Sequence, residues 1–589
     1  MKKIIFLIFI LFFTKGFSQI PAEATLETGY TITSHGYILY PSPDSNYANV
    51  IEVGPGKQYQ EIHDIPLTSV VKNTLIKIFR RTDPYRTKVF VDVIGTENER
   101  VRFQGIPDAN GNLPVISFEN ATTWGNTTDA TLESGSAFVV FGTWSNKPAW
   151  IDIVNLHIKD APYASVWAKG DHISVKGCIL ENSANGVFFQ AANQLLIEIS
   201  TYILIEGCKF TGNGTVNGWL HHNIYAQGMH TLIQFNNIEA LRTGAFGASL
   251  KDRSSHTVIR YNKIETSART LDLVEPEDTD MVLTTDPNWD DVYVYGNLLI
   301  NKDVPVTGAG VNMVHYGYDN TPTFRREGTL YFFNNTIAID RNDGIWRVNL
   351  FDVNSTNSVV EFSNNIVTAI GMQTFYIFRS NNTDNAGSIN FDTSYFSILN
   401  TQNNWQLTEN AGSYFMTGDS NIIEGTDPGF VNANSNDFTL NNNSPCIGNG
   451  VDLMNSLGLS VGFNSVNPHI DITRSDYSAP SLGCFSSTAT ASIDETIDFF
   501  SIKSTAYPNP FNEQITIEYT LKDNSQCSII IYNSLGQKVK TLVKSELISG
   551  VHHALWDGKN DLNQSVSKGL YYLVIQANNK KATRSILYN

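Results

Sequence analysis

Cysteine is scarce in this chain, which has five among 589 residues. None of them is spaced with histidine as in a zinc module, so no structural zinc site is expected. Charged residues are also few, at 16%, and acids dominate, because 57 Asp and Glu outnumber 40 Lys and Arg. A formal net charge of −17 does not suit a protein that must displace counterions from phosphates, which excludes general nucleic-acid binding.

Long apolar runs are absent after the N-terminus, where no stretch of 18 apolar residues occurs, so no membrane span is expected. At the N-terminus, Lys2 and Lys3 precede an apolar run over 4–13 and then small and polar residues. This pattern predicts a signal peptide over 1–18. Because no cysteine follows directly, a lipoprotein is not expected. The sequence therefore predicts an exported protein, which we expect to be a monomer.

Short alternating segments that end in Asn or Gly recur along the middle of the chain. Most are preceded by a second short strand-like segment, and the spacing of 22 to 38 residues is too short for the four-stranded blades of a propeller. Two or three strands per repeat, with Asn or Gly at the bends, indicate an all-β solenoid whose coils pair with their neighbours. The repeated segments are 151–156, 173–178, 203–208, 232–237, 258–263, 292–297, 330–335 and 359–364.

This layout resembles the secreted right-handed parallel β-helix proteins of the pectin-lyase-like superfold. The resemblance implies a parallel β-helix domain over 19–486, including an N-terminal cap, and closing coils over 420–486. Cys178 and Cys208 fall at matching places in two repeats. We interpret them as small residues stacked in the core, with a disulfide as the alternative.

A polar linker is predicted over 487–504, followed by a small β-sandwich over 505–589. Four motifs lie in this last segment: Ala-Tyr-Pro-Asn-Pro-Phe at 506–511, a strand ending in Leu-Gly-Gln at 537, Trp-Asp-Gly at 556–558, and Gly-Leu-Tyr-Tyr-Leu at 569–573. They resemble the C-terminal sorting domain of the type IX secretion route. The resemblance implies the type IX secretion machinery as a partner and a secreted or cell-surface location. An immunoglobulin-like carbohydrate-binding module is the alternative.

A basic island lies at 221–269, with six Lys and Arg against three acids, inside the repeats of an acidic chain. Such local charge attracts an anionic polysaccharide or oligosaccharide. Strand alternation places Leu250 inside the helix and Lys251 and Arg253 outside it. Aligning Ile224 on Leu250 places Tyr225 beside Lys251, one coil away. We predict Lys251, Tyr225 and Arg253 as catalytic residues, and the following as substrate-binding residues: Asn223, His222, Arg242, Arg269, His315 and Arg347.

A Lys, a Tyr and an Arg suit β-elimination from a uronic acid, in which a base removes the C5 proton and a cation stabilises the developing enolate. We predict Lys251 or Tyr225 as the base and Arg253 as the group that neutralises the carboxylate. The segment around Lys251 resembles the lysine-containing strand of the chondroitinase-B and alginate lyase family, which implies that Lys251 is the base. Leu273 and Val274 stand where that family has an arginine, so Arg253 or Arg269 would take its role. The same groups would allow the elimination of water from a terminal uronic acid.

An acidic segment over 271–291 follows the island and contains no Lys or Arg. Asp272 and Glu275 are candidate ligands of a calcium ion, although a solvated acidic loop also explains the segment. The acids could instead serve a β-helix glycoside hydrolase. Because two of the four polygalacturonase motifs are absent, that hydrolase is not favoured. A non-catalytic glycan-binding adhesin is the third possibility. The eight acids are Asp272, Glu275, Glu277, Asp278, Asp280, Asp286, Asp290 and Asp291.

Overall fold

The computed structural model gives the conformation of most of the chain. The residues that it describes are 26–125, 135–142, 147–191, 199–266, 268–277, 280–302, 311–340, 348–355, 357–370, 375–379, 387–398, 405–409, 415–453, 480–486, 503–507, 509, 511–521, 524–533, 537–577 and 580–588. The predicted signal peptide and most of the predicted linker lie outside these residues. The chain divides into two compact units, Met1–Ala489 and Thr490–Asn589.

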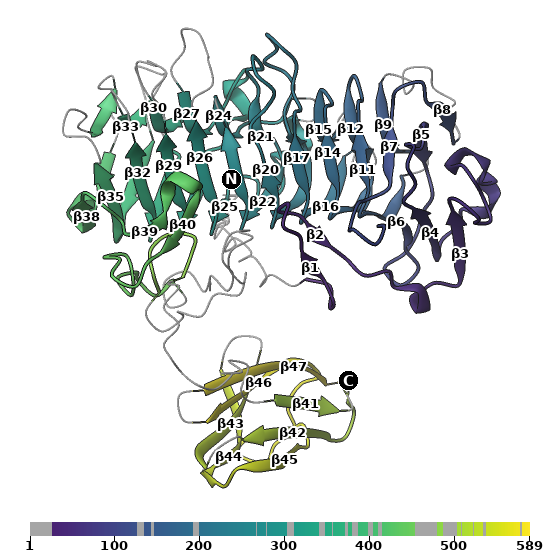
Figure 1. Cartoon of the computed structure of the whole chain (residues 1–589). Coiled ribbons are helices and arrows are strands. Elements are labelled where there is room, and N and C mark those ends of the chain that lie inside the picture. Colours follow the sequence, from purple (N-terminus) through teal and green to yellow (C-terminus); the bar gives the residue numbers. More distant parts are fainter. Residues whose placement is uncertain are drawn as a thin grey trace, which may run out of the picture. The chain divides into compact units, whose positions relative to one another are not determined.

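Three long parallel sheets build the first unit (Figure 1). Successive strands of the chain pass through the sheets in turn, and each strand pairs with its counterpart one coil away, as in Ile151 with Ile173. The arrangement is a parallel β-helix, and the predicted fold class is confirmed. The propeller alternative is excluded, because its blades would be antiparallel.

Sheet 1 has 13 strands and contains all the repeated segments of the sequence. Its strands are β3 (Asn49–Val53), β4 (Thr74–Phe79), β6 (Val101–Ile106), β10 (Ala149–Val154), β13 (Asp171–Lys176), β16 (Ser200–Glu206), β19 (Gly228–Gln234), β22 (Ser255–Arg260), β25 (Val292–Tyr295), β28 (Thr329–Phe333), β31 (Val359–Ser363), β34 (Ser388–Phe391) and β37 (Phe415–Thr417).

Sheet 2 has 11 shorter strands, which follow sheet 1 after one sharp bend in each coil. They are β7 (Val115–Ser117), β11 (His157–Lys159), β14 (Ile179–Glu181), β17 (Lys209–Thr211), β20 (Asn237–Ile238), β23 (Lys263–Thr266), β26 (Leu298–Lys302), β29 (Thr336–Asp340), β32 (Ile366–Ile370), β35 (Ser394–Ile398) and β38 (Ile422–Gly425).

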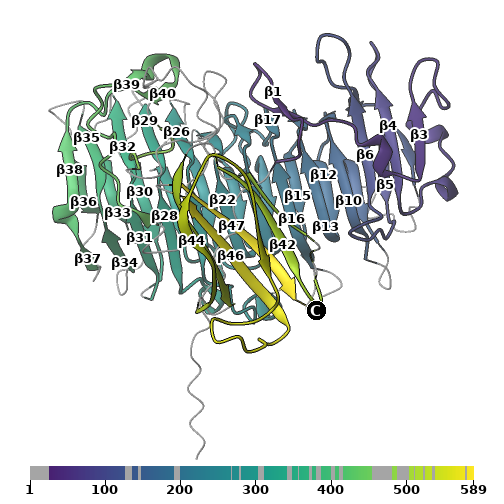
Figure 2. The same cartoon turned by 90° about the horizontal axis from the view of Figure 1, so that it is seen from below.

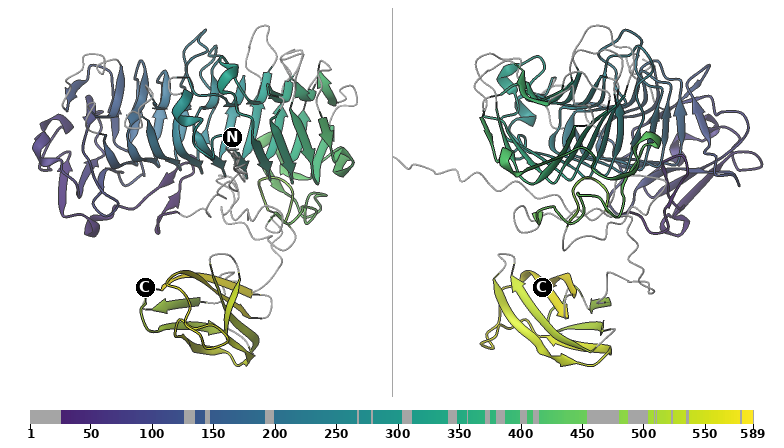
Figure 3. Two further views of the ribbon diagram at one scale, coloured as in Figure 1. Left: turned by 180° about the vertical axis from the view of Figure 1, so that it is seen from behind. Right: turned by 60° about the vertical axis from the view of Figure 1, so that its left-hand side comes forward.

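Sheet 3 has 12 strands and contains the second strand that the sequence predicts in most repeats. They are β5 (Thr87–Val91), β8 (Thr122–Trp124), β9 (Ser136–Phe141), β12 (Ala164–Lys169), β15 (Asn185–Phe189), β18 (Ile224–Ala226), β21 (Ala248–Asp252), β24 (Arg269–Leu273), β27 (Val311–Tyr316), β30 (Val348–Val353), β33 (Phe375–Arg379) and β36 (Trp405–Glu409). Figure 2 labels several of them, including β12, β15, β30, β33 and β36, and Figure 3 shows the stacked coils in two further views.

The core lies between the three sheets, because one side chain of every two along each strand points inward. Ile224, Leu250, Leu271 and Val314 come from four successive strands of sheet 3, and all are fully buried in one cluster. The polar residues beside them therefore occupy the outer face of sheet 3. Alternation fixes this face as soon as the inner residues are known, which is why the sequence placed Lys251 outside.

An asparagine ladder closes the bend between sheets 1 and 2. The side-chain oxygen of Asn297 accepts the backbone and side-chain N–H groups of Asn262, both at 3.0 Å, and Asn335 does the same for Asn297. The bend requires a left-handed residue just before each ladder position, as at Gly296 with φ 66°. The asparagines that the sequence places at the bends thus form a stacked ladder in the structure. The ladder residues are Asn236, Asn262, Asn297, Asn335 and Asn365.

Cys178 and Cys208 continue this ladder toward the N-terminus. Both are buried free thiols, and the Cys178 backbone N–H points at the Cys208 sulfur at 3.4 Å. The Cys208 backbone N–H donates in turn to Asn236 at 2.9 Å. The interpretation of a stacked core pair is confirmed, and the disulfide alternative is wrong.

Shorter elements lie around the sheets. Two small hairpins pair antiparallel, β1 with β2 and β39 with β40. None of the helices in the described part of the chain could cross a membrane. These elements are β1 (Thr31–Ile32), β2 (Ile38–Leu39), η1 (Asp44–Asn46), η2 (Ile62–Asp64), η3 (Leu67–Ser69), α1 (Asp280–Leu283), η5 (Pro322–Phe324), η6 (Asp419–Asn421), β39 (Phe430–Asn432), η7 (Ala433–Ser435) and β40 (Asp437–Leu440).

The second unit has its own core and two antiparallel sheets. Trp556 and Phe511, from two of the predicted motifs, are both buried in this core with ring centroids 5.4 Å apart. Its strands are β41 (Lys503–Tyr507), β42 (Ile515–Leu521), β43 (Ser525–Asn533), β44 (Lys538–Leu547), β45 (Gly550–Trp556), β46 (Gly569–Ala577) and β47 (Lys580–Tyr588).

Candidate functional site

Charged and aromatic side chains form a row across the outer face of sheet 3. Tyr225 pairs with Lys251 in the strand register, and Lys251 pairs with Asp272. Asp272 pairs with His315, and His315 with Asp352. Five successive coils therefore bring these residues side by side, and the predicted adjacency of Tyr225 and Lys251 is present.

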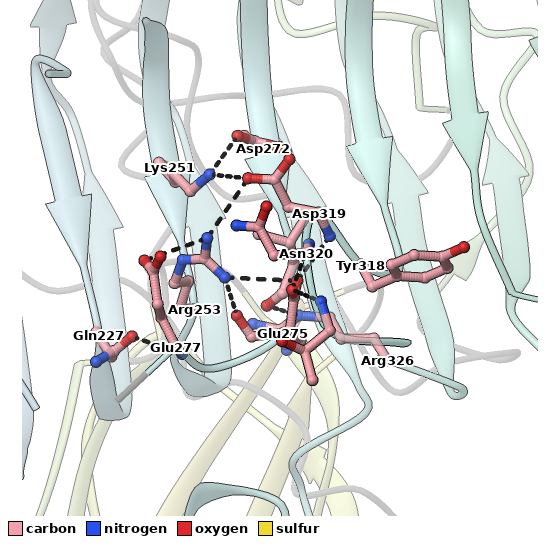
Figure 4. A network of polar contacts seen from close by, with 12 residues as sticks. Gln227, Lys251, Arg253, Asp272, Glu275, Glu277, Tyr318, Asp319, Asn320 and Arg326 are labelled. Atoms are coloured by element: carbon pink, nitrogen blue, oxygen red, sulfur yellow. Dashed lines mark hydrogen bonds and ion pairs between the residues drawn. The ribbon is translucent and has the colours of Figure 1, made fainter. Parts of the chain in front are cut away.

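Lys251 lies between two carboxylates. Its Nζ donates to Asp272 Oδ2 at 3.0 Å and to Asp319 Oδ2 at 2.6 Å (Figure 4). Its side chain is 7% exposed, whereas Asp319, from the loop after β27, is 28% exposed. The loop carboxylate of Asp319 is thus the more exposed of the two partners of the Lys251 amine.

Asp272 is fully buried and is surrounded by cationic groups, one of which is the Lys251 amine. Oδ2 accepts from Lys251 and, at 2.9 Å, from Arg269, while Oδ1 lies 2.7 Å from His315 Nδ1. Burial by itself would raise the pKa of this carboxyl, but the charges of Arg269 and Lys251 and the His315 hydrogen bond outweigh it. The pKa of Asp272 therefore lies well below its usual range, and the group stays ionised.

His315 is the next member of the row and is also buried. Burial opposes its charged form, but the hydrogen bond and the charge of Asp272, aided by Asp352, raise its pKa. Its Nε2 faces the Asn354 side-chain amide at 2.7 Å. His315 therefore supports Asp272 from the side opposite to Lys251.

Arg253 lies just beyond β21, on the same face as Lys251, and is 1% exposed. It donates from Nη1 to the Glu275 backbone carbonyl and faces three carboxylates: Glu275 at 3.4 Å, Glu277 at 3.4 Å and Asp319 at 3.5 Å. Figure 4 shows Lys251 and Arg253 pointing at the same Asp319 carboxylate. The predicted pairing of an amine with a guanidinium is present, but acidic loops cover the guanidinium.

Glu275 fixes the loop that carries Asp319. Its carboxylate accepts the backbone N–H groups of Asp319, Asn320 and Thr321, each at 2.7 Å. Arg326 fixes the far end of the same loop, because its fully buried guanidinium donates to Asp252 Oδ2 at 3.0 Å and to the Val274 carbonyl at 3.2 Å.

Tyr225 is a hydrogen-bond donor in this arrangement. Its hydroxyl donates to Glu277 at 2.8 Å. Burial, and then the negative charge and hydrogen bond of Glu277, raise its pKa despite the nearby Arg253. Tyr225 is therefore protonated near neutral pH, which is the form that a general acid needs and not the form of a base.

The other predicted substrate-binding residues are not part of the cluster around Lys251, Arg253 and Asp319. His222 is buried and accepts the Ala248 N–H at 2.9 Å, and burial together with Lys251 and Arg269 holds its pKa well below the usual value. Asn223 is buried and donates to the Glu239 carbonyl, and Arg242 donates to the Gly212 carbonyl. Arg347 lies outside the described residues.

The two carboxylates predicted as calcium ligands do not fit a calcium ion. Both oxygens of Asp272 are occupied by cationic groups, and both oxygens of Glu275 accept backbone N–H groups. Among the described residues, no cluster of three or more His, Cys, Asp or Glu could hold a metal ion. The alternative of a solvated acidic loop is also wrong for Glu275, which is 1% exposed.

Sequence reasoning missed Asp319 and Arg326. Both lie in the loop between β27 and β28, which shows no strand alternation to assign its side chains to a face. Long-range charge pairing is also invisible in one sequence, since Asp319 lies 68 positions from Lys251. The only available signal was that an acidic segment follows the basic island.

The site can hold a carboxylate between an amine and a guanidinium, and it offers a phenol one coil away. Two of its guanidinium donors, Arg253 Nε and Arg269 Nε, are buried and have no hydrogen-bond partner within the described structure. Unsatisfied buried donors are costly, so these two atoms carry hydrogen-bonding capacity that the described residues leave unused.

Residues 505–589 match the family described as "Secretion system C-terminal sorting domain". The type IX sorting domain predicted for this segment is therefore confirmed, and it implies an extracellular or cell-surface location. No curated protein matches the sequence.

Solved structures similar to this chain include the pectate lyase Pel9A, at 11% identity and a TM-score of 0.39, covering 75% of this chain and 97% of that one. A pectin methylesterase from Aspergillus niger has 10% identity and a TM-score of 0.20, covering 64% of this chain and 86% of that one. A tailspike protein from Acinetobacter baumannii bacteriophage Fri1, described as a capsular polysaccharide depolymerase, has 10% identity and a TM-score of 0.25, covering 87% and 73%.

Proposed function

We propose that the protein is a secreted lyase that performs β-elimination on a polysaccharide or oligosaccharide containing uronic acid. The observation that carries the proposal is the convergence of Lys251 Nζ and Arg253 Nη2 on one carboxylate oxygen, Asp319 Oδ2, at 2.6 and 3.5 Å. A side chain of the protein fills a position that suits the C6 carboxylate of a uronic acid. Residues 1–18 are proposed as the export signal that precedes type IX secretion.

Substrate binding exchanges one carboxylate for another, so it costs little free energy. When the substrate carboxylate replaces that of Asp319, neither Lys251 nor Arg253 is left as an unpaired buried charge. Glu275 still holds the loop backbone through its three N–H contacts, so only the Asp319 side chain has to turn away.

Lys251 is the proposed base, and Arg253 is the proposed neutraliser of the substrate carboxylate. Removal of the C5 proton puts negative charge onto that carboxylate, and a guanidinium already in place stabilises it without reorganisation. Lys251 is ion-paired in the resting site, so its ammonium first releases a proton to water, and the neutral amine then takes the C5 proton. Asp272 holds the amine from below and stabilises the charge that Lys251 regains with this proton. Arg269 and His315 keep Asp272 in position.

Tyr225 is the proposed acid for the leaving oxygen. It lies beside Lys251 on the same face, so proton removal and protonation of the leaving group occur on one side of the sugar ring. The same acid would protonate either a glycosidic oxygen or a hydroxyl group. Chain cleavage and loss of water from a terminal uronic acid are therefore close variants of one reaction.

A glycoside hydrolase is the second candidate, because Glu277 and Asp319 place two partly exposed carboxylates around Arg253 Nη2. Hydrolysis needs an acid and a base or nucleophile of this kind. A non-catalytic adhesin would use the same cationic pair for binding alone.

The decisive assay follows absorbance of the conjugated double bond while the mature protein is incubated with uronate polysaccharides. Elimination produces new ultraviolet absorbance, hydrolysis produces reducing ends without it, and an adhesin produces neither. Lys251→Ala should lower the elimination rate by about 10²- to 10⁴-fold, the usual contribution of a general base.

Lys263→Ala is the matched control, since Lys263 is a partly exposed lysine in sheet 2 whose amine pairs with Glu265. It should retain the wild-type rate. Full activity in a folded Lys251→Ala protein would show that Lys251 is not the base.

A further inference from the structure

Five rings form a row outside the helix, at the start of five successive strands of sheet 1. In each strand the ring-bearing residue interrupts the strand pairing, because its neighbours on both sides pair with an adjacent coil and it does not. Each has a left-handed backbone, with φ between 48° and 58°. Bulky residues rarely adopt this conformation, so five in register indicate a constraint beyond packing. The ring-bearing residues are Trp150, His172, Tyr202, His230 and His256.

The first four rings stack face to face. Their centroids are 3.6, 4.2 and 4.7 Å apart, and neighbouring planes differ by 10° to 19°. Stacked rings leave no face between them for a sugar, so the row does not suit the stacking of a glycan. The stack instead fixes the orientation of its last member, His230.

The last step breaks the stacking. His256 stands at 84° to His230, and the two Nδ1 atoms face each other at 2.8 Å. Only one proton fits between two imidazole nitrogens at this distance, so at least one Nδ1 presents a lone pair.

A carboxylate lies next to the pair. Asp286 accepts a hydrogen bond from Ser255, the neighbour of His256 in the chain, at 2.7 Å. The Asn288 N–H donates to the same carboxylate at 2.9 Å, and the His256 N–H donates to the Asn288 carbonyl at 3.2 Å. The negative charge of Asp286 also interacts electrostatically with the His230 ring. Asp286 is thus held beside His256 by one short segment, and His230, His256 and Asp286 are all partly exposed residues.

We propose that His230 and His256 bind a divalent transition metal ion of the copper(II) class through their Nδ1 atoms. With metal–nitrogen bonds of about 2.0 Å, the present separation gives an angle of about 90° at the metal, as in square-planar sites. No third His, Cys, Asp or Glu in the described chain completes a cluster here, so water fills the remaining positions. Asp286 stabilises the ion by its charge and by hydrogen bonds to that water.

The test is titration of the full-length mature protein, without any added tag, with copper(II), followed by calorimetry and electron paramagnetic resonance. We expect one ion per chain at this site, with a resonance signal split by two nitrogens. His230→Asn and His256→Asn should each weaken binding by at least about tenfold. Asn tolerates the left-handed backbone, so both variants should fold.

His172→Asn is the matched control, because His172 has the same backbone conformation and position in the row but its Nδ1 contacts Asp171 at 3.0 Å. It should bind copper(II) like the wild type. Copper(II) should also raise the unfolding temperature of the wild type and of His172→Asn but not of the other two variants. Equal loss of binding in all three variants, or binding in the wild type without the two-nitrogen signal, would overturn the proposal.

Discussion

Asp272 shows how a single residue holds the site together. It is fully buried and stabilises two or three positive charges at once, through Lys251, Arg269 and His315. Removing one partner of such a network leaves the others as uncompensated buried charges, which costs about 3–5 kcal/mol. The same residue supports stability and, in the proposed reaction, the position of the base.

The pH dependence of stability follows from the two shifted groups. Asp272 has a lowered pKa, so its contribution is present above the unfolded value of about 3.9 and is lost as the pH falls through its folded pKa. His315 has a raised pKa, so its contribution is present below the unfolded value of about 6.5 and is lost as the pH rises through its folded pKa. Their joint contribution is therefore largest between these two pH values.

His315→Gln should reveal this dependence. Urea unfolding of the wild type and the variant should show a larger difference in unfolding free energy at about pH 6 than at about pH 8, because the charged imidazole contributes only at the lower pH. The groups that face the ring are Asp272, Asp352, Arg269 and Asn354. A difference that is constant with pH would mean that His315 is not charged in the folded protein.

At the scale of the element, the asparagine ladder stabilises the bends between sheets 1 and 2. Asn297 Oδ1 accepts two donors, and Nδ2 donates to the carbonyls of Ile259 and Tyr295 and to Asn335. All of these groups are buried, so loss of the amide leaves several of them without a partner.

Asn297→Ala should destabilise the β-helix by about 3 kcal/mol, measured by urea unfolding. Asn443→Ala is the control, because Asn443 is an exposed turn residue and its replacement should cost about 0.5 kcal/mol or less. Equal effects of the two substitutions would contradict the structural role of the ladder.

The sequence predicts the strands better than it predicts the loops. The alternation in 258–263 identifies a strand of sheet 1 because inner and outer positions differ in polarity. The left-handed positions that begin these strands, such as Tyr202, escaped notice, since nothing local in the sequence distinguishes Tyr202 from an ordinary strand residue. Its conformation depends on the neighbouring coils.

At the scale of the whole molecule, two separate cores predict two independent folding units. The β-helix core and the core of the sorting domain share no residue. Such units usually unfold in separate steps.

A chain truncated after Ala489 should therefore keep the unfolding transition of the β-helix and, in cells, should no longer be exported past the outer membrane. Circular dichroism melting and cell fractionation measure the two effects. Loss of the β-helix transition in the truncated protein would show that the units depend on each other.

The sequence by itself determined the solenoid, the outer position of Lys251 and Tyr225, the stacked cysteines and the sorting domain. These follow from alternation and local motifs, which act over a few residues. Only the tertiary structure determines that the Asp319 carboxylate pairs with the Lys251 amine and that carboxylates cover the buried Arg253. The contact between His230 and His256 is likewise determined by the tertiary structure alone. Such contacts join residues 22 to 68 positions apart, and only the stacking of coils brings them together.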